Sequence, residues 1–237
     1  MSTLINTIWT WLVHEYNITF VVQDRYKLFL QGFGNTLIIN VGAAVIGILI
    51  GVIVATVRVY HAQTGRLTAP DKIFGAYLAV FRGTPTVVQL LIMYFIIFKS
   101  VNNGVIVAIL SFGINSGAYV AESVRAGILA VDIGQTEAGR SLGLPAFSTM
   151  LFIVLPQAIK NILPALGNEF ITLLKETSIA GYVSIIDLTR AGAYVRIQTA
   201  DPYFSLLFVA LVYFLVVLGV TKLLKILERR LAKSDRG

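Results

Sequence analysis

Long stretches without a charged side chain divide this sequence. No Asp, Glu, Lys or Arg lies between Lys27 and Arg58, and another such stretch runs from Lys99 to Glu122. An α-helix needs about 20 mainly apolar residues to cross a bilayer. The pattern therefore predicts an all-α polytopic membrane protein. The expected spans are residues 36–57, 74–98, 103–121, 159–174 and 203–221.

The segment before the fourth span is ambiguous on hydropathy alone. Its apolar run at 147–159 has the density of a membrane segment, but it is short and carries Pro145 and Pro156. Prolines and short length favour a cytoplasmic helix and turn. We therefore expect a cytoplasmic loop at 132–158, inside a membrane domain that covers residues 31–230. Residues 231–237 are expected to form a cytoplasmic tail.

Composition supports a membrane protein. Only 13% of the residues are charged, about half of the 25% or so that is usual in soluble domains. The net charge of +7 is not arranged as a basic stripe with interleaved aromatic residues, so nucleic acid is not an expected partner. The chain has no cysteine, which excludes disulfides and thiolate metal sites. No metal site is expected, and membrane lipid is the expected surroundings.

Lys and Arg near the span ends predict the orientation. They are in excess between the first two spans and after the last span, and such segments are usually cytoplasmic. Five spans then place the N-terminus outside and the C-terminus in the cytoplasm. Residues 1–30 lack the basic start of a signal peptide. Trp9 and Trp11 suggest an amphipathic segment at the outer membrane surface, and an unanchored apolar extension is the alternative.

The loop at 132–158 has strong local signals. Residues 135–142 favour a short helix, with Glu137 in the first turn, where a carboxylate complements the helix dipole. Gly143 is suited to end that helix, and Pro145 to begin a second one. Leu142, Leu144 and Phe147 should then lie exposed at the corner. An apolar corner in water usually marks a partner surface.

The same loop resembles the EAA loop of ABC-importer permeases. The residues that carry the resemblance are Glu137, Ala138, Gly139, Gly143, Ile153, Leu155 and Pro156. Gly139 departs from the family, which usually has alanine there, but both residues are small. The alternative is an amphipathic loop helix that has no partner.

The resemblance implies that the loop docks on a separate ATPase. The chain contains no G-x-x-x-x-G-K-[ST] phosphate loop, so it is not expected to be an enzyme or to hold a cofactor. ATP and magnesium would be bound by two ATP-binding cassette subunits, whose closure would switch the pore. Small residues at 138, 139 and 143 would let the partner's backbone approach closely. The expected coupling residues are Glu137, Ala138, Gly139, Leu142, Gly143, Leu144 and Pro156.

Further motifs extend the resemblance over roughly Gly32 to Arg230. Residues 81–90 (FRGTPTVVQL), 115–127 (NSGAYVAESVRAG) and 157–178 (QAIKNILPALGNEFITLLKETS) look like signatures of polar-amino-acid permeases. The family implies a type I importer core of five helices per subunit in the bacterial cytoplasmic membrane. It also implies a second permease subunit, identical or related, and an extracytoplasmic amino-acid-binding protein.

Polar and ionisable residues inside the spans are the candidates for the substrate pathway, because such residues are costly in a membrane. A zwitterion needs a cation for its carboxylate and an anion for its amine, and Arg82 and Glu169 could supply them. Alternatively, Arg82 snorkels or pairs with Glu122, and Glu169 pairs with Lys160 or Lys175. The pathway candidates are Arg82, Thr84, Gln89, Asn168, Glu169 and Thr172.

Gly83 and Pro85 are expected to kink the second span and to free carbonyl groups that face the pathway.

Two other classes of function compete with the permease. A secondary transporter or channel driven by an ion gradient would predict inverted repeats, and the five spans show no clear internal repeat. An intramembrane enzyme would need paired catalytic groups at span centres, and the spans offer neither a histidine nor a carboxylate pair.

Overall fold

The chain folds into helices joined by short connections, in a computed structural model that describes residues 2–201 and 203–233. No strand occurs in these residues, which confirms the all-α class. The α-helices are α1 (Ser2–Tyr16), α2 (Arg25–Thr64), α3 (Thr68–Gly83), α4 (Thr86–Ile92), α5 (Gly104–Leu129), α6 (Ile133–Ser141), α7 (Ala146–Thr149), α8 (Leu155–Glu176), α9 (Leu188–Thr199) and α10 (Phe204–Lys233). Short π or 3₁₀ segments are η1 (Asn17–Val21), η2 (Val22–Asp24), η3 (Met93–Ile97), η4 (Met150–Val154) and η5 (Thr177–Val183).

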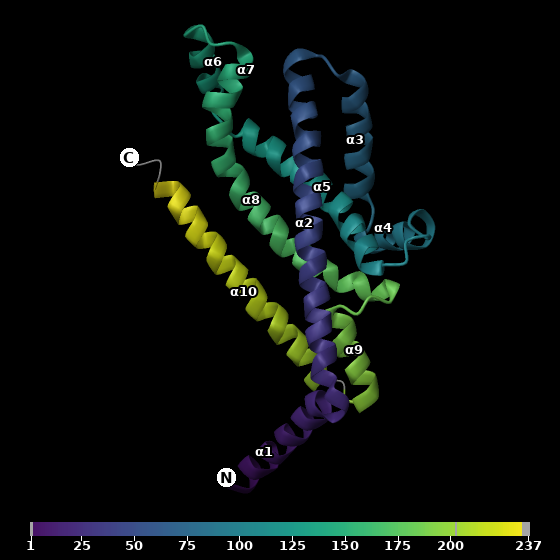
Figure 1. Cartoon of the computed structure of the whole chain (residues 1–237). Helices are drawn as coiled ribbons and strands as arrows, with labels where there is room; N and C mark the ends of the chain where they lie inside the picture. The colour runs from purple at the N-terminus through teal and green to yellow at the C-terminus, as the bar shows by residue number, and fades with distance from the viewer. Residues whose placement is uncertain (1, 202, 234–237) are drawn as a thin grey trace.

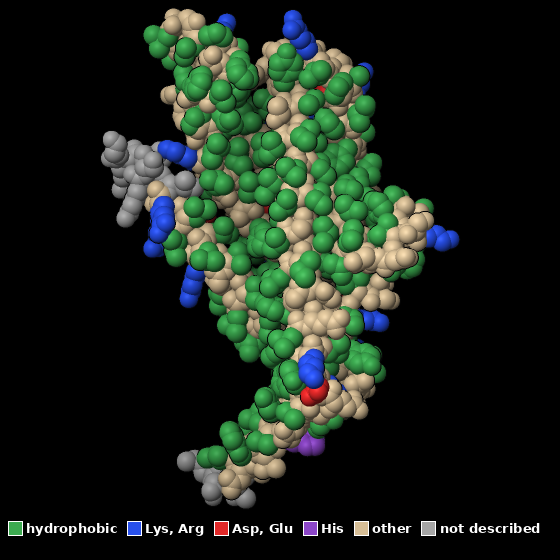
Figure 2. All heavy atoms as spheres, viewed as in Figure 1, with side chains coloured by type: hydrophobic (Ala, Val, Ile, Leu, Met, Phe, Trp, Pro, Cys, Tyr) green, Lys and Arg blue, Asp and Glu red, His purple; other side chains and the backbone are tan. Residues whose placement is uncertain are grey.

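Within the described residues, four helical stretches are long and apolar enough to cross a membrane, and five if the bent pair of α3 with α4–η3 is one span. The four are Ile5–Thr64, Gly104–Leu129, Ala146–Val183 and Phe204–Arg230. In Figure 2, hydrophobic side chains cover much of the visible face, and most Lys and Arg side chains lie around its edges. This distribution is typical of a protein whose surface faces lipid.

The helices that cross the centre of the molecule are α2 and α5 (Figure 1), and they pack closely. Glycines make this approach possible. A Cβ atom added at Gly47 would lie 2.9 Å from the Oγ atom of Ser116, and one added at Gly113 would lie 2.8 Å from Ile46. Small residues at such contacts are the usual way for membrane helices to pack closely. The core of the bundle therefore depends on glycines from both helices.

The second predicted span is broken, as Gly83 and Pro85 led us to expect. Helix α3 ends at Gly83, and α4 begins at Thr86 after a bend of 111°. Pro85 has no backbone N–H to continue the helix, and its ring restricts the residue before it. The prediction of a kink at these residues is confirmed.

The N-terminal region differs from the expected interfacial segment of residues 1–30. Gln23 and Asp24 have positive φ angles of 56° and 55°, and they separate α1 from α2. Helix α2 then begins at Arg25 and runs for 40 residues, so it extends well beyond the predicted span of 36–57 at both ends. At the N-terminal side the cause is that polar residues such as Gln31 and Asn35 stay helical, which a count of apolar residues misses.

Two further elements differ from the sequence-based expectation. The stretch 146–183 forms one continuous helical run, so the predicted cytoplasmic segment and the fourth span are not separated by a turn at Pro156. Pro156 closely follows the π-helical segment η4, and a local π adjustment of this kind accommodates a proline within a helical run. Helix α9 lies between the fourth and fifth predicted spans, where no helix was predicted. Its N-terminus is capped by Asp187, which accepts hydrogen bonds from the N–H groups of Arg190 (2.9 Å) and Thr189 (3.3 Å).

Candidate functional site

The cytoplasmic loop contains the first candidate site, at one end of the molecule, where α6 and α7 stand beside the start of α8 (Figure 1). Helix α6 begins at Ile133, and the Oδ1 atom of Asp132 accepts a hydrogen bond from the N–H of Gly134 at 2.7 Å. Asp132 therefore caps the helix. The expectation that Glu137 lies in the first turn is wrong, because this cap starts the helix two residues earlier; Glu137 is exposed one turn further on.

Gly139 is needed for the packing of the loop itself. It is buried, and a Cβ atom there would lie 2.8 Å from both Ile153 Cδ1 and Thr149 Cγ2. The small residue thus lets α6 pack against α7 and η4. The close approach of a partner at this position stays a prediction, and the structure shows that the space beside Gly139 is filled by the loop's own side chains. Ala138 is exposed on the same helix.

The corner of the loop exposes large apolar side chains. Gly143 has a φ angle of +82° and ends α6 in the left-handed conformation that glycine favours. Leu142 is 82% exposed and Phe147 is 76% exposed. Leu144 is half-buried rather than exposed, and its carbonyl accepts a hydrogen bond from Arg140 at 2.9 Å. The corner is therefore a turn closed by a hydrogen bond, with two apolar side chains on its outside.

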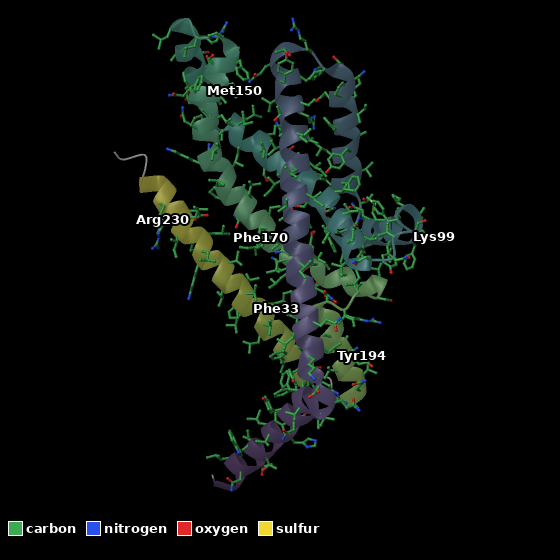
Figure 3. All side chains as sticks on the ribbon, viewed as in Figure 1. Phe33, Lys99, Met150, Phe170, Tyr194 and Arg230 are labelled. Carbon is green, nitrogen blue, oxygen red and sulfur yellow. The ribbon has the colours of Figure 1, made fainter. Side chains whose placement is uncertain are left out.

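The base of the loop is tied to α8. Pro156 lies exposed in the first turn of α8, and the neighbouring Gln157 donates a hydrogen bond to the Oε1 atom of Gln135 on α6 at 3.2 Å. Met150, labelled in Figure 3, marks the η4 segment that leads without interruption into α8. A displacement of the loop would therefore be passed directly to α8.

A stripe of exposed polar residues follows one side of α8. Asn168, Thr172 and Lys175 are exposed, and their spacing of four and three residues places them on one face of the helix. Exposed polar groups are unfavourable against lipid, so this face is suited to a water-filled pathway or a partner helix. Phe170, labelled in Figure 3, lies in the C-terminal half of α8. Its neighbour in the sequence is Glu169, the second candidate for contact with the substrate.

Glu169 is half-buried beside α5. The Oγ atom of Ser116 donates a hydrogen bond to the Oε1 atom of Glu169 at 3.1 Å. Ser116 itself is buried between α2 and α5. The carboxylate is therefore held at the junction of three helices, at the edge of the polar stripe.

Arg82, a residue of α3, contacts α5 at a different position from Glu169. Its Nη1 atom lies 3.8 Å from the Oε2 atom of Glu122, its guanidinium lies 5.8 Å from the centre of the Tyr119 ring, and Glu122 also pairs with Arg125. The structure shows the alternative that we considered, in which Arg82 pairs with Glu122. Ser116 and Glu122, which hold Glu169 and Arg82, are six residues apart, about 9 Å along the helix. The partners of Arg82 and Glu169 are thus separated along α5, and joint binding of one zwitterion by the two side chains stays a prediction.

Gln89 closes the break between α3 and α4. Its side-chain N–H₂ group donates to the carbonyl of Phe81 (2.9 Å), the carbonyl of Thr84 (3.1 Å) and the hydroxyl of Thr84 (2.7 Å). Its Oε1 atom accepts from Asn115 at 2.7 Å. The carbonyls freed by Gly83 and Pro85 were expected to face the pathway; those of Phe81 and Thr84 are instead paired within the protein. Any role of Gln89 or Thr84 in transport stays a prediction.

Asn115 and Ser116 were not among the residues predicted to line the pathway. Both lie within the predicted span 103–121, so the rule that selected Asn168 would also have found them. They were read only as part of a family signature. In the part of the chain that the structure describes, no group of three or more His, Cys, Asp or Glu side chains could hold a metal ion.

Comparison with known proteins decides the family. Residues 47–233 match the family described as the binding-protein-dependent transport system inner membrane component. The chain belongs to this family. It is 38% identical over 227 residues to a putative glutamine transport system permease protein of Rickettsia bellii, covering 93% of this chain and 99% of the relative. It is 36% identical over 209 residues to the arginine transport system permease protein of Bacillus subtilis, covering 87% and 93%.

A solved structure agrees with these relatives. The crystal structure of an amino acid ABC transporter with histidines matches at a TM-score of 0.81 and 39% identity, covering 89% of this chain and 98% of that chain. The chain is thus a membrane-spanning permease subunit of an amino acid ABC importer, as the EAA-like loop and the other motifs predicted. It is a transport subunit rather than an enzyme, and the ion-gradient alternative is not supported.

Proposed function

We propose that this permease is driven by a separate ATPase that docks on the corner of the loop at 132–158. The observation that supports this most is the pair of exposed apolar side chains, Leu142 and Phe147, on a turn that Gly143 and the hydrogen bond from Arg140 to Leu144 close. Desolvation of such side chains stabilises protein–protein contacts. Two ATP-binding cassette subunits, one for each permease subunit, are the expected partners.

The loop geometry suggests how ATP hydrolysis would drive transport. ATP and its magnesium ion would be bound by the partner, and closure of the partner subunits would displace α6 and α7. Gly139 packs α6 against Thr149 and Ile153, so the loop would move as one body. Because 146–183 is one helical run, that movement would reach the polar stripe on α8. Alternating access then follows from rigid-body motion of helices around a fixed site.

We further propose that Glu169 receives the α-ammonium group of the substrate. The relatives are named for glutamine and arginine, whose side chains differ in charge but which share an α-ammonium group. A half-buried carboxylate at the edge of a polar face is suited to bind that shared cation. Asn168 and Thr172 would supply hydrogen bonds along the same path. Arg82, which is already paired with Glu122, is a weaker candidate for the substrate carboxylate.

The remaining partners and the orientation follow from the family and from the basic residues. We expect a second permease subunit, identical or related, and a separate extracytoplasmic amino-acid-binding protein. The chain would lie in a bacterial cytoplasmic membrane with its N-terminus outside and its C-terminus in the cytoplasm. Arg230, labelled in Figure 3, lies near the C-terminal end of α10, in the segment expected to be cytoplasmic.

The test is uptake into proteoliposomes that contain the permease, its ATPase and its binding protein. Labelled glutamine and arginine should accumulate only when ATP reaches the ATPase, and Glu169→Gln should reduce uptake of both at least tenfold. Gln63→Glu, at an exposed position near the end of α2, controls for an exchange of amide and carboxylate away from the pathway. Accumulation without ATP would contradict the coupling, and normal uptake by the Glu169→Gln variant would remove the proposed ligand.

A further inference from the structure

Ser116 lies where α2, α5 and α8 meet. We propose that Ser116 is a positioning residue that orients the Glu169 carboxylate toward the substrate path. The inference rests on the proposed role of Glu169 as the ligand of the substrate ammonium. It assigns a transport role to a residue of α5 that faces a residue of α8.

The hydrogen bond of Ser116 differs from that of other hydroxyls in the bundle. Hydroxyl side chains in helices commonly donate to the carbonyl four residues earlier. In this chain Thr36, Thr56 and Thr221 do so, at 2.9, 2.7 and 2.7 Å. Ser116 instead donates to the Oε1 atom of Glu169, 53 residues away, at 3.1 Å. Its only proton is thus directed to the carboxylate.

The surroundings leave Ser116 little freedom to turn away. Ser116 is 1% exposed, and Gly47 of α2 packs against it. A Cβ atom at Gly47 would lie 2.9 Å from Ser116 Oγ and 3.0 Å from Ser116 Cβ. Glycine at position 47 is therefore what allows the serine to lie between the two helices. A side chain fixed in this way can fix the group to which it donates.

This arrangement leaves the carboxylate free to bind a cation. An ionised carboxylate has about four acceptor positions on its two oxygens, and Ser116 uses one of them. Glu169 is half-buried, so it remains partly accessible. An unrestrained glutamate would sample several rotamers, and the fixed hydrogen bond removes part of this freedom before the substrate arrives. The result is a preorganised anion on the face of α8 next to Asn168.

A double-mutant cycle in the same proteoliposomes tests the proposal, with uptake of labelled arginine and ATP hydrolysis both measured per assembled complex. We expect Ser116→Ala to lower the amount of arginine transported per ATP hydrolysed by about tenfold. Loss of packing alone would lower the yield of complex rather than this ratio. Ser111→Ala is the matched control, because Ser111 is also a buried serine of α5. In the Ser116→Ala, Glu169→Gln double variant, no loss beyond that of Glu169→Gln alone is expected.

The outcomes separate this inference from the proposed function. If Glu169→Gln transports normally, both proposals are wrong. If Glu169→Gln is defective and Ser116→Ala transports normally, only the positioning role is wrong. Defects that multiply in the double variant would also overturn it, because the two residues would then act independently. Should Ser116→Ala fail to assemble, Ser116→Cys keeps the approximate size and a weak donor. Its ratio of arginine transported to ATP hydrolysed is expected to fall between those of wild type and Glu169→Gln. A ratio equal to that of wild type, or below that of Glu169→Gln, would contradict the proposal.

Discussion

The side chain of Gln89 donates a hydrogen bond to the carbonyl of Phe81 at 2.9 Å, across the break between α3 and α4. This contact, with the ones to Thr84, replaces backbone hydrogen bonds that the break removes. In a membrane, backbone that is not helical is tolerated only where the protein pairs its polar groups. The bend of 111° therefore depends on one glutamine and on Asn115, which holds it.

Replacing Gln89 should destabilise the permease. Gln89→Leu would remove one donor from the carbonyls of Phe81 and Thr84 and would take the Oε1 acceptor from the buried side chain of Asn115, and a buried polar group left unpaired costs about 1–3 kcal/mol. We expect a lower midpoint of thermal unfolding in detergent for this variant. Gln63→Leu, at an exposed position, is the control and should unfold as wild type does. Equal midpoints for both variants would show that water or lipid satisfies the carbonyls instead.

Enlarging Gly139 should distort the coupling loop. The methyl group of Gly139→Ala would lie 2.8 Å from Thr149 Cγ2, and overpacking of this kind typically costs about 1–3 kcal/mol. We expect weaker co-purification of the ATPase with Gly139→Ala, and none with Gly139→Leu. Gly75→Ala, on α3, where an added Cβ atom meets nothing within 4 Å, is the control and should bind normally. Full binding by Gly139→Leu would mean that the loop packs differently.

The proposed orientation can be tested by thiol labelling, because the chain has no native cysteine. Tyr194 on α9, labelled in Figure 3, and Phe147 on α7 are both exposed, and α9 and α7 lie toward opposite ends of the molecule (Figure 1). An impermeant maleimide should label Tyr194→Cys in intact cells freed of any outer envelope. It should label Phe147→Cys only after the membrane is permeabilised. The reverse pattern would invert the topology.

Asp187, which caps α9 between the last two spans, should make stability depend on pH. Burial raises the pKa of its carboxyl from 3.8 to about 6. The folded state therefore binds a proton more tightly than the unfolded state, so this contribution is fully present below about pH 4 and is lost as pH rises to 6. Asp187→Asn keeps the cap but removes the titration. The advantage of wild type over this variant should thus shrink between pH 4.5 and 6.5; parallel thermal midpoints would contradict the shift.

Much of the fold could be predicted from the sequence because charge-free stretches, Pro85 and Gly143 act locally. The ends of α2 could not, because residues such as Gln31 and Asn35 continue the helix outside the apolar stretch. Helix α9 was missed because no long apolar stretch marks it and its start depends on the Asp187 cap.

The candidate site was predictable in part. The exposed corner at Leu142 and Phe147 follows from the glycine and proline on either side of the turn. The partners of Gln89, Arg82 and Glu169 could not be predicted, since they lie 26, 40 and 53 residues away on α5. Gly139 shows the same limit, because only the packed structure reveals that its small size serves the loop itself.

Docking of the ATPase on the loop corner is the central claim, and protection of a thiol tests it most directly. Leu142→Cys should react quickly with a maleimide in the solubilised permease alone, because Leu142 is 82% exposed. With the ATPase bound, we expect labelling to slow at least tenfold. Leu67→Cys, at the exposed turn between α2 and α3, should react at the same rate in both samples. Equal labelling of Leu142→Cys with and without bound ATPase would contradict the account.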